Sequence, residues 1–306
     1  MSNELKTFNP ADIIQEKVDM KSYAESLLDA LRADTEVYDI IKPLGLTKGE
    51  VRENIGRLND FREDYNICKN CPGYDKCPKA EKHISIYVCK DGNYLTTRCE
   101  PCKKAIEKAM IDAKYIFNDF PSEWKKSTLK KLDLSENRRP LIKEFVNITK
   151  GKSNRWLFVT GNHKVGKSYV LVTFANEFIA MGLGQVGVIN AVTKFKELAD
   201  ISFKQKEYFN DQIKALSTLP LLIIDNFGEE YKNEFIRDSI VIPILSERNH
   251  NNLPTFFSSD FTIKEIERLY SVGKNGGEIR GKQLGKIILE MAEKEFDLTG
   301  ASIYKK

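Results

Sequence analysis

The sequence has no long apolar run, and this absence excludes a protein that spans a membrane by a helix. No stretch of its 306 residues approaches the roughly eighteen consecutive apolar residues that a membrane-spanning helix needs. The first residues, MSNELKTFNPADIIQEK, contain no apolar core of the kind that directs secretion. We therefore expect a cytoplasmic protein without a membrane partner.

A strong net charge is also missing. The 48 basic and 44 acidic residues leave a formal charge of +4 at pH 7. Such a balance permits contact with nucleic acid but does not predict it. Internal repeats and low-complexity tracts are absent as well. The length and an apolar content of 41% indicate a globular protein of one to three domains.

Cysteine is missing from most of the chain, because all six cysteines lie between Cys68 and Cys102. A cytosolic chain rarely keeps disulfides, so clustered cysteines favour a metal site. The segments CKNCPGYDKC and RCEPCKK contain two Cys-x-x-Cys pairs, Cys68 with Cys71 and Cys99 with Cys102. Two such pairs joined by a hairpin of about thirty residues predict a structural, tetrahedral Zn²⁺ site.

Other ligand sets for this metal remain open. Cys77 and His83 lie close enough in the sequence to replace one ligand, whereas Cys89 falls within the hairpin and is expected to be spare. The alternative to a metal site is a set of reduced thiols packed as small apolar groups. The hairpin itself is predicted by HISIYV and NYLTTR, with a turn at Asp91 and Gly92.

The composition changes along the chain and predicts four segments. Residues 1–65 have helical spacing, beginning after a cap at Asn9 and Pro10, and a capping box is expected at Thr47 and Glu50. The zinc module would occupy residues 66–105, a helical connector residues 106–120, and a larger C-terminal domain residues 121–306. The helical segment could be either a plain bundle or a module that docks onto another protein.

The last segment predicts the fold class α/β. Four short apolar runs, WLFVTG, VGVINA, LLIIDN and PTFFSSD, alternate with helical stretches. This alternation is typical of a parallel sheet covered by helices on both faces.

A phosphate-binding loop follows the first of these strands. The pattern Gly161-x-x-x-x-Gly166-Lys167-Ser168 stands between an apolar strand and a helix, which is the context that such a loop requires. Backbone N–H groups and the positive end of the helix would hold phosphate oxygens. Lys167 would reach the β and γ phosphates of ATP, and Ser168 would bind Mg²⁺. Asp225, at the end of LLIIDN, is the expected acid beside the metal.

The residue after Asp225 and the polar residues at the end of the later strand PTFFSSD decide whether ATP is hydrolysed. Asp225 and Asn226 are the candidate catalytic residues, but Asn226 cannot accept a proton from water. Polar residues at the tip of the later strand, Ser258, Ser259 and Asp260, would face the γ phosphate; the alternative is an ordinary turn at the strand end. The sequence therefore predicts ATP binding with slow hydrolysis or none.

The motifs together resemble one bacterial family. Four segments are similar to the replicative-helicase loaders of the DnaI/DnaC type: GNHKVGKS, LLIIDNFGEE, FIRDSIVIPILSERNHNNLPTFFSSDF and the preceding C-x-x-C-P-G block. The resemblance is closer to the DnaI type than to the DnaC type. The resemblance implies a C-terminal AAA+ domain that binds ATP and single-stranded DNA. It implies an N-terminal module that binds the hexameric replicative DNA helicase, contact with other primosome proteins, and an oligomer on the helicase ring.

Three positions depart from the family pattern. Relatives usually carry an acid at the position of Asn226 and Asn at the position of Asp260. They often carry an arginine near KIILEM, where this chain has Glu290. An arginine supplied to a neighbouring subunit can change the rate by roughly 10³–10⁵-fold. Arg237 and Arg280 are the candidate substitutes.

Residues 193–214 are a candidate surface for single-stranded DNA. Basic side chains there alternate with aromatic ones, and such a pattern can track phosphates and stack on bases. The residues are Lys194, Phe195, Lys196, Phe203, Lys204, Lys206, Tyr208 and Phe209. The alternative is an amphipathic helix pair that covers the sheet.

Two other functions compete with helicase loading. An IstB-like transposition helper would have the same AAA+ core but no zinc-bearing N-terminal module. A zinc-ribbon nucleic-acid-binding protein could use ATP only as a structural ligand. Co-purification with the replicative helicase distinguishes these possibilities.

Overall fold

The chain divides into two compact units, and the division falls at residue 110 of the sequence. The computed structural model describes residues 20–92, 94–133, 135–274 and 276–300. Residues 1–110 belong to the first unit and residues 111–306 to the second. The predicted helix start at Asn9 and Pro10 lies outside the described residues.

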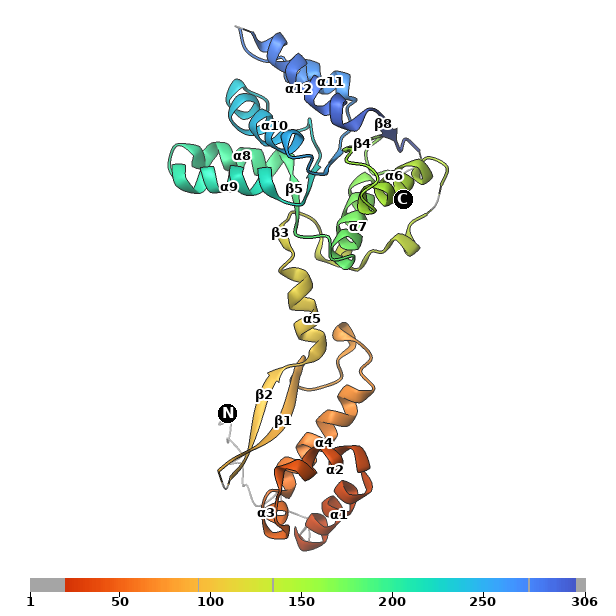
Figure 1. Cartoon of the computed structure of the whole chain (residues 1–306), viewed down its shortest axis with the longest axis vertical. Coiled ribbons are helices and arrows are strands. Elements are labelled where there is room, and N and C mark those ends of the chain that lie inside the picture. The colour runs from red at the N-terminus through yellow and green to blue at the C-terminus, as the bar shows by residue number, and fades with distance from the viewer. Residues whose placement is uncertain (1–19, 93, 134, 275, 301–306) are drawn as a thin grey trace, which may run out of the picture. The chain divides into compact units, whose positions relative to one another are not determined.

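The first unit begins with helices, as the sequence predicts. Their bounds are α1 Met20–Ala33, α2 Thr35–Ile41, η2 Lys42–Leu44, α3 Lys48–Glu53 and α4 Ile55–Lys69 (Figure 1). The capping box at the start of α3 is confirmed. Thr47 Oγ1 accepts from the N–H of Glu50 at 3.2 Å, and the Glu50 carboxylate accepts from the N–H of Thr47 at 2.7 Å. Helix α4 continues beyond residue 65, so Cys68 lies on a helix.

A small core holds this unit together. Val37 of α2 and Leu58 and Phe61 of α4 are buried against Leu95, which comes from the hairpin that follows. The hairpin is confirmed and consists of β1 Ile84–Asp91 and β2 Tyr94–Pro101, which pair antiparallel. It is preceded by η3 Tyr74–Lys76 and followed by α5 Lys103–Asp112.

The second unit is built on a parallel sheet, which confirms the predicted α/β class. Within the described residues, six strands pair in the order β3-β5-β6-β7-β4-β8. Their bounds are β3 Tyr115–Asn118, β4 Leu157–Thr160, β5 Val186–Asn190, β6 Leu221–Asp225, β7 Thr255–Ser258 and β8 Glu295–Asp297. All four predicted apolar runs are strands of this sheet.

Helices cover both faces of the sheet because alternate strand residues point to opposite sides. Leu222 and Ile224 of β6 face a core shared with α8–α12, whereas Leu221 and Ile223 face a core shared with α6 and α7. Figure 1 shows α6 and α7 on one side of the sheet and α8, α9 and α10 on the other. The elements are η4 Ser122–Lys126, η5 Leu129–Lys131, α6 Arg138–Thr149, α7 Lys167–Ala180, α8 Ala191–Ser202, α9 Lys206–Thr218, η6 Ile236–Val241, α10 Ile242–His250, α11 Ile263–Leu269 and α12 Gly277–Ala292.

The predicted helical connector 106–120 is wrong in its second half. Helix α5 ends at Asp112, and Tyr115–Asn118 forms β3, which pairs with β5 at the edge of the sheet. Aromatic and β-branched residues favour this extended conformation. Tyr115 is buried in the core beside α7, and its hydroxyl bonds to the Asn176 side chain. The second unit therefore begins before residue 121.

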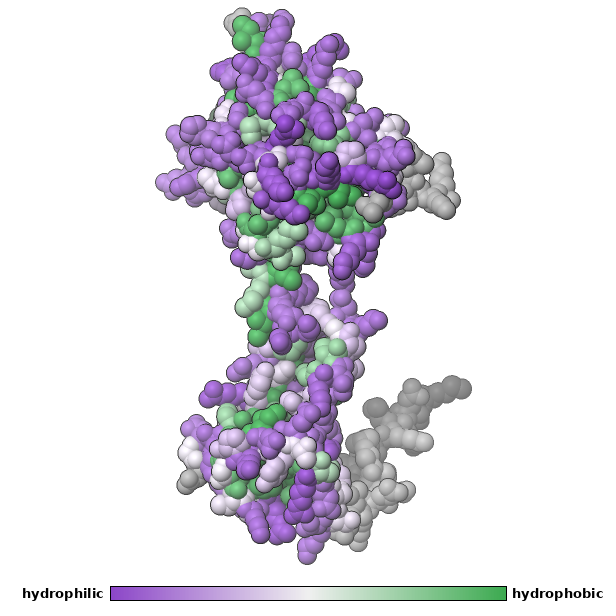
Figure 2. All heavy atoms as spheres, turned by 45° about the vertical axis from the view of Figure 1, so that its right-hand side comes forward, coloured by the Kyte–Doolittle hydropathy of each residue, from purple (hydrophilic) through white to green (hydrophobic). Residues whose placement is uncertain are grey.

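One face of the molecule is mostly polar in each unit (Figure 2). Figure 2 shows a largely hydrophilic surface interrupted by smaller hydrophobic patches. In the part of the chain that the structure describes, no helix is long and apolar enough to cross a membrane.

Candidate nucleotide-binding site

The phosphate-binding loop leaves the carboxyl end of β4, whose four residues are buried. Gly161 has φ +139°, and a Cβ atom on it would lie 2.9 Å from the backbone N of Thr299. Gly166 has φ +92° and precedes the first residue of α7. Residues that carry a side chain rarely adopt such backbone φ angles. Both glycines are therefore needed for the loop to turn back onto the helix.

Lys167 is the central charged group of this loop. Its side chain is 6% exposed, and its Nζ donates to the carbonyls of Gly161 at 2.8 Å and Asn162 at 3.1 Å. The same Nζ lies 2.6 Å from Oδ1 of Asp260. Ser168 follows in the first turn of α7 and is half-buried.

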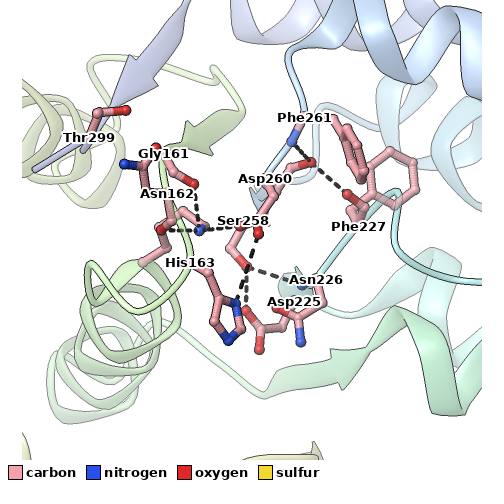
Figure 3. A network of polar contacts seen from close by, with 12 residues as sticks. Gly161, Asn162, His163, Asp225, Asn226, Phe227, Ser258, Asp260, Phe261 and Thr299 are labelled. Carbon is pink, nitrogen blue, oxygen red and sulfur yellow. Dashed lines mark hydrogen bonds and ion pairs between the residues drawn. The ribbon is translucent and has the colours of Figure 1, made fainter. Parts of the chain in front are cut away.

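Asp225 lies at the end of β6, and β7 stands between this strand and β4. The Ser258 hydroxyl donates to Oδ1 of Asp225, and it accepts from the N–H of Asn226 at 3.1 Å. Asn226 has φ +56°, a left-handed conformation that Asn adopts more readily than most residues. The structure thus brings the P-loop, Asp225 and the end of β7 to one edge of the sheet (Figure 3).

The three polar residues at the tip of β7 have different partners. Ser258 bonds to Asp225 as described. Ser259 is fully buried, donates to the Phe227 carbonyl at 2.6 Å and accepts from the N–H of Phe261 at 3.0 Å. Ser259 therefore holds the turn together. Only Asp260 points toward the P-loop, where His163 Nδ1 also lies 3.8 Å from its Oδ2.

Two acids that follow Asn226 lie in different environments. Glu230 is 2% exposed, accepts from the N–H of Gly228 at 2.8 Å and bonds to the Tyr270 hydroxyl. Burial raises the pKa of this carboxyl, and its partners show a structural role. Burial also raises the pKa of Glu229, and the negative charges of Asp260 and Asp225 add to the effect. Glu229 is therefore the acid that lies near the phosphate site.

The candidate substitutes for a missing arginine also differ. Arg237 is 2% exposed, donates to the carbonyls of Tyr270 and Val272 and pairs with Asp238 at 2.7 Å. It cannot reach a neighbouring subunit from this position. Arg280 on α12 is about half exposed, so it remains the candidate that a second molecule could meet.

The basic and aromatic residues of 193–214 do not form one surface. Lys194 is buried, bonds to Glu197 and to Gln212 at 2.9 Å, and lies 4.9 Å from the centre of the Phe117 ring. Phe195 is buried in the core. These two residues are thus wrong as DNA contacts, because they face the sheet. The exposed members are Lys196, Phe203, Lys204, Lys206 and Tyr208, and Phe203 is 86% exposed.

Most of the cysteines gather at one place in the first unit. Cys68, Cys71, Cys77 and Cys102 line a cavity of about 20 Å³ together with His83. The backbone N–H groups of His83 and Lys79 lower the pKa of the Cys77 thiol.

Cys99 is placed differently. It lies on β2 opposite Ile86, is exposed, and does not line this cavity. Across residues 20–92, 94–133, 135–274 and 276–300, no group of three or more His, Cys, Asp or Glu side chains is arranged to hold a metal ion.

Sequence reasoning missed the residues that brace the P-loop from outside. The Arg138 guanidinium at the start of α6 donates to the Val165 carbonyl at 3.0 Å. Asn137 donates to the Thr299 carbonyl at 3.2 Å, and the N–H of Leu298 donates to the Thr160 carbonyl at 2.8 Å. The bracing residues Asn137, Arg138 and Leu298 lie 27 or more positions from the loop residues or the tail that they contact and belong to no motif, so no local signal could have found them.

The parallel sheet and the phosphate-binding loop at the start of α7 define a P-loop protein of the α/β class. No family model matches the sequence. Over 293 residues the chain is 20% identical to the replicative helicase loader DnaI of Bacillus subtilis (strain 168), which covers 90% of this chain and 91% of the relative.

Two solved structures are also similar. A crystal structure of DnaI has 24% identity and a TM-score of 0.54, covering 60% of this chain and 97% of that one. A protein of Streptococcus pyogenes serotype M3 described as a primosome component has 22% identity and a TM-score of 0.51, covering 65% of this chain and 100% of that one. The resemblance to the bacterial helicase loaders that the motifs indicated is therefore confirmed.

Proposed function

We propose that the chain is a primosomal helicase loader. It binds the hexameric replicative DNA helicase and, with ATP bound, helps to place that ring on single-stranded DNA during initiation or restart of replication. The observation that supports this most is the similarity to a replicative helicase loader over 90% of the chain. The match therefore extends beyond the P-loop fold that many unrelated proteins have.

The second unit would bind ATP with Mg²⁺. Lys167 offers its ammonium to the phosphates, and the Ser168 hydroxyl and Asp225 carboxylate are oxygen ligands of the kind Mg²⁺ prefers. These contacts hold the ground state and do not require hydrolysis. Because Asn226 cannot take a proton from water, turnover should be far below the roughly 1–100 s⁻¹ of kinases. Binding at micromolar to sub-millimolar ATP is expected.

Single-stranded DNA would bind where exposed aromatic and basic side chains adjoin. Phe203 at the end of α8 lies 5.7 Å, ring centre to ring centre, from Phe235. Lys204, Lys206 and Tyr208 are the neighbouring exposed groups. An aromatic ring that is this exposed can stack on a base while the ammonium groups contact phosphates.

A structural zinc ion would bind at the cysteine cluster of the first unit, although the described side chains are not arranged around a metal in this structure. Cys68, Cys71, Cys77 and Cys102 provide four sulfur donors around one small cavity, and four thiolates are a common set for structural Zn²⁺. This set replaces Cys99 by Cys77, with His83 as the alternative fourth ligand. When bound, the ion would connect α4 to the hairpin and stabilise the unit.

The helicase partner can be tested by co-purification from the organism that encodes the chain. A tagged full-length protein should retain the hexameric replicative helicase. A fragment of residues 1–112 should retain it as well, because we assign the contact to the first unit. A fragment of residues 103–306 should bind ATP and single-stranded DNA without the helicase. Absence of the helicase from the full-length preparation would refute the proposal, and its retention by 103–306 alone would reverse the assignment.

The two competing functions are not favoured. A transposition helper or a zinc-ribbon protein would not account for similarity to a helicase loader across both units of the chain. Contacts with other primosome proteins and an oligomer on the helicase ring remain part of the proposal. The same purification, examined by light scattering, gives the stoichiometry.

A further inference from the structure

The ammonium of Lys167 has no donor left for a phosphate. A lysine ammonium has three N–H donors. In this structure its three acceptors are the carbonyls of Gly161 and Asn162, at 2.8 and 3.1 Å, and the Asp260 carboxylate at 2.6 Å. The Lys167 side chain is only 6% exposed. A phosphate oxygen that bonds to this ammonium must therefore displace one of the three.

The three acceptors lie on different sides of the site. Figure 3 shows Gly161 and Asn162 on one side and Asp260 on the other. The glycine-rich loop holds the inner phosphates of a nucleotide, so the acceptor away from the loop lies toward the terminal phosphate. A β phosphate can replace a loop carbonyl and leave the Lys167–Asp260 pair intact. A γ phosphate would take the place of Asp260.

The displaced carboxylate would then face the γ phosphate at short range. A phosphate oxygen bonded to the same ammonium would lie within about 5 Å of the Asp260 carboxylate, given ordinary hydrogen-bond lengths. His163 Nδ1 lies 3.8 Å from Asp260 Oδ2, and the Glu229 carboxylate is close enough to interact with that of Asp260. Like charges at this separation repel strongly enough to change affinity by about ten- to a hundredfold.

We propose that Asp260 is a specificity-determining residue that discriminates against the γ phosphate. The site then binds a nucleoside diphosphate more tightly than the corresponding triphosphate, and the Lys167–Asp260 ion pair is the contact that the triphosphate must break. This inference rests on the proposed nucleotide binding at the P-loop.

The test is a comparison of two dissociation constants in the full-length protein. ADP and the non-hydrolysable β,γ-methylene analogue of ATP are titrated calorimetrically with Mg²⁺ present. The wild type should bind the analogue about tenfold or more weakly than ADP. Asp260→Asn, which keeps the shape and removes the charge, should reduce that ratio by about tenfold through tighter analogue binding. Asp260→Glu should keep the preference for ADP.

A matched control removes a carboxylate elsewhere. Asp211 is exposed on α9, so Asp211→Asn should leave the ratio at its wild-type value. Equal binding of the two nucleotides by the wild type, or an unchanged ratio in Asp260→Asn, would overturn the inference and leave ATP binding intact. A wild type that binds neither nucleotide would overturn both the inference and the proposed ATP site. If Asp260→Asn does not fold, the wild-type ratio decides alone.

Discussion

A buried arginine that holds β7 in place gives a quantitative test of the fold. Arg248 on α10 is fully buried. Its guanidinium donates to the carbonyls of Leu216 and Leu219 at 3.0 and 2.8 Å, to the Pro254 carbonyl at 2.7 Å and to the Thr255 hydroxyl at 2.8 Å. These bonds tie the end of α9 to the start of β7, the strand that leads to Asp260. Burial lowers the pKa of this guanidinium to about 9.

Replacing this side chain by methionine should leave two carbonyls without a donor. The Pro254 carbonyl still accepts from the N–H of Leu222, and the Thr255 hydroxyl still donates to the Leu253 carbonyl. Each orphaned buried carbonyl costs about 1–3 kcal/mol, and removal of a buried charge returns part of that loss. We therefore expect Arg248→Met to reduce the free energy of unfolding by about 3 kcal/mol, a fall in Tm of roughly 6–12 °C.

Tryptophan fluorescence reports on the unfolding of the second structural unit, which contains Arg248. The two tryptophans of the sequence, Trp124 and Trp156, both belong to the second unit. Urea denaturation of the full-length protein should show a midpoint lower by roughly 1–2 M for Arg248→Met. The control is Arg268→Met, since Arg268 is exposed on α11. A variant at position 248 that unfolds within about 0.5 kcal/mol of the wild type would refute the reasoning.

Four further predictions concern the sites. Lys167→Ala should abolish ATP binding, because the phosphates lose their cation, and calorimetry with Mg²⁺·ATP checks this. Asn226→Asp should raise ATP turnover by about ten- to a hundredfold in a phosphate-release assay with helicase and single-stranded DNA; an unchanged rate would show that position 226 does not limit the reaction. Elemental analysis should find one zinc per chain in the wild type and in Cys99→Ser but not in Cys71→Ser, whereas a metal-free wild type with normal circular dichroism would contradict the zinc site. Phe203→Ala should weaken single-stranded DNA binding by about five- to a hundredfold in fluorescence anisotropy, and wild-type affinity would point to another surface.

The local features of this chain were predictable from sequence. The P-loop and the capping box at Thr47 depend on residues within a few positions of one another, so their patterns are complete in one short stretch. Buried strands such as Leu221–Asp225 stand out because both faces are apolar. Strands β3 and β8 were missed because they are only four and three residues long and lie between charged stretches.

Contacts between distant residues could not be predicted in the same way. The alternation of basic and aromatic residues placed Lys194 on a surface. In the structure it is buried, because Glu197, Gln212 and the Phe117 ring provide partners for its ammonium group. The ion pair of Lys167 with Asp260 joins residues 93 positions apart. The sequence patterns assigned both Lys167 and Asp260 to the nucleotide site. Their direct contact follows from the sheet order, in which β7 lies next to β4. The sequence left Cys77 open as an alternative ligand, and the fold decides that Cys77 lines the cysteine cavity whereas Cys99 does not.

The position of β3 has a practical consequence for work on fragments. This strand covers one edge of β5, and it starts only three residues after α5 ends. A fragment that began at residue 121 would remove β3 and leave the N–H and C=O groups of Val186–Asn190 open along an apolar strand. Uncovered edges of this kind recruit other chains and aggregate. Such a fragment should precipitate or form soluble aggregates, whereas one that begins at Lys103 should remain monodisperse in size-exclusion chromatography.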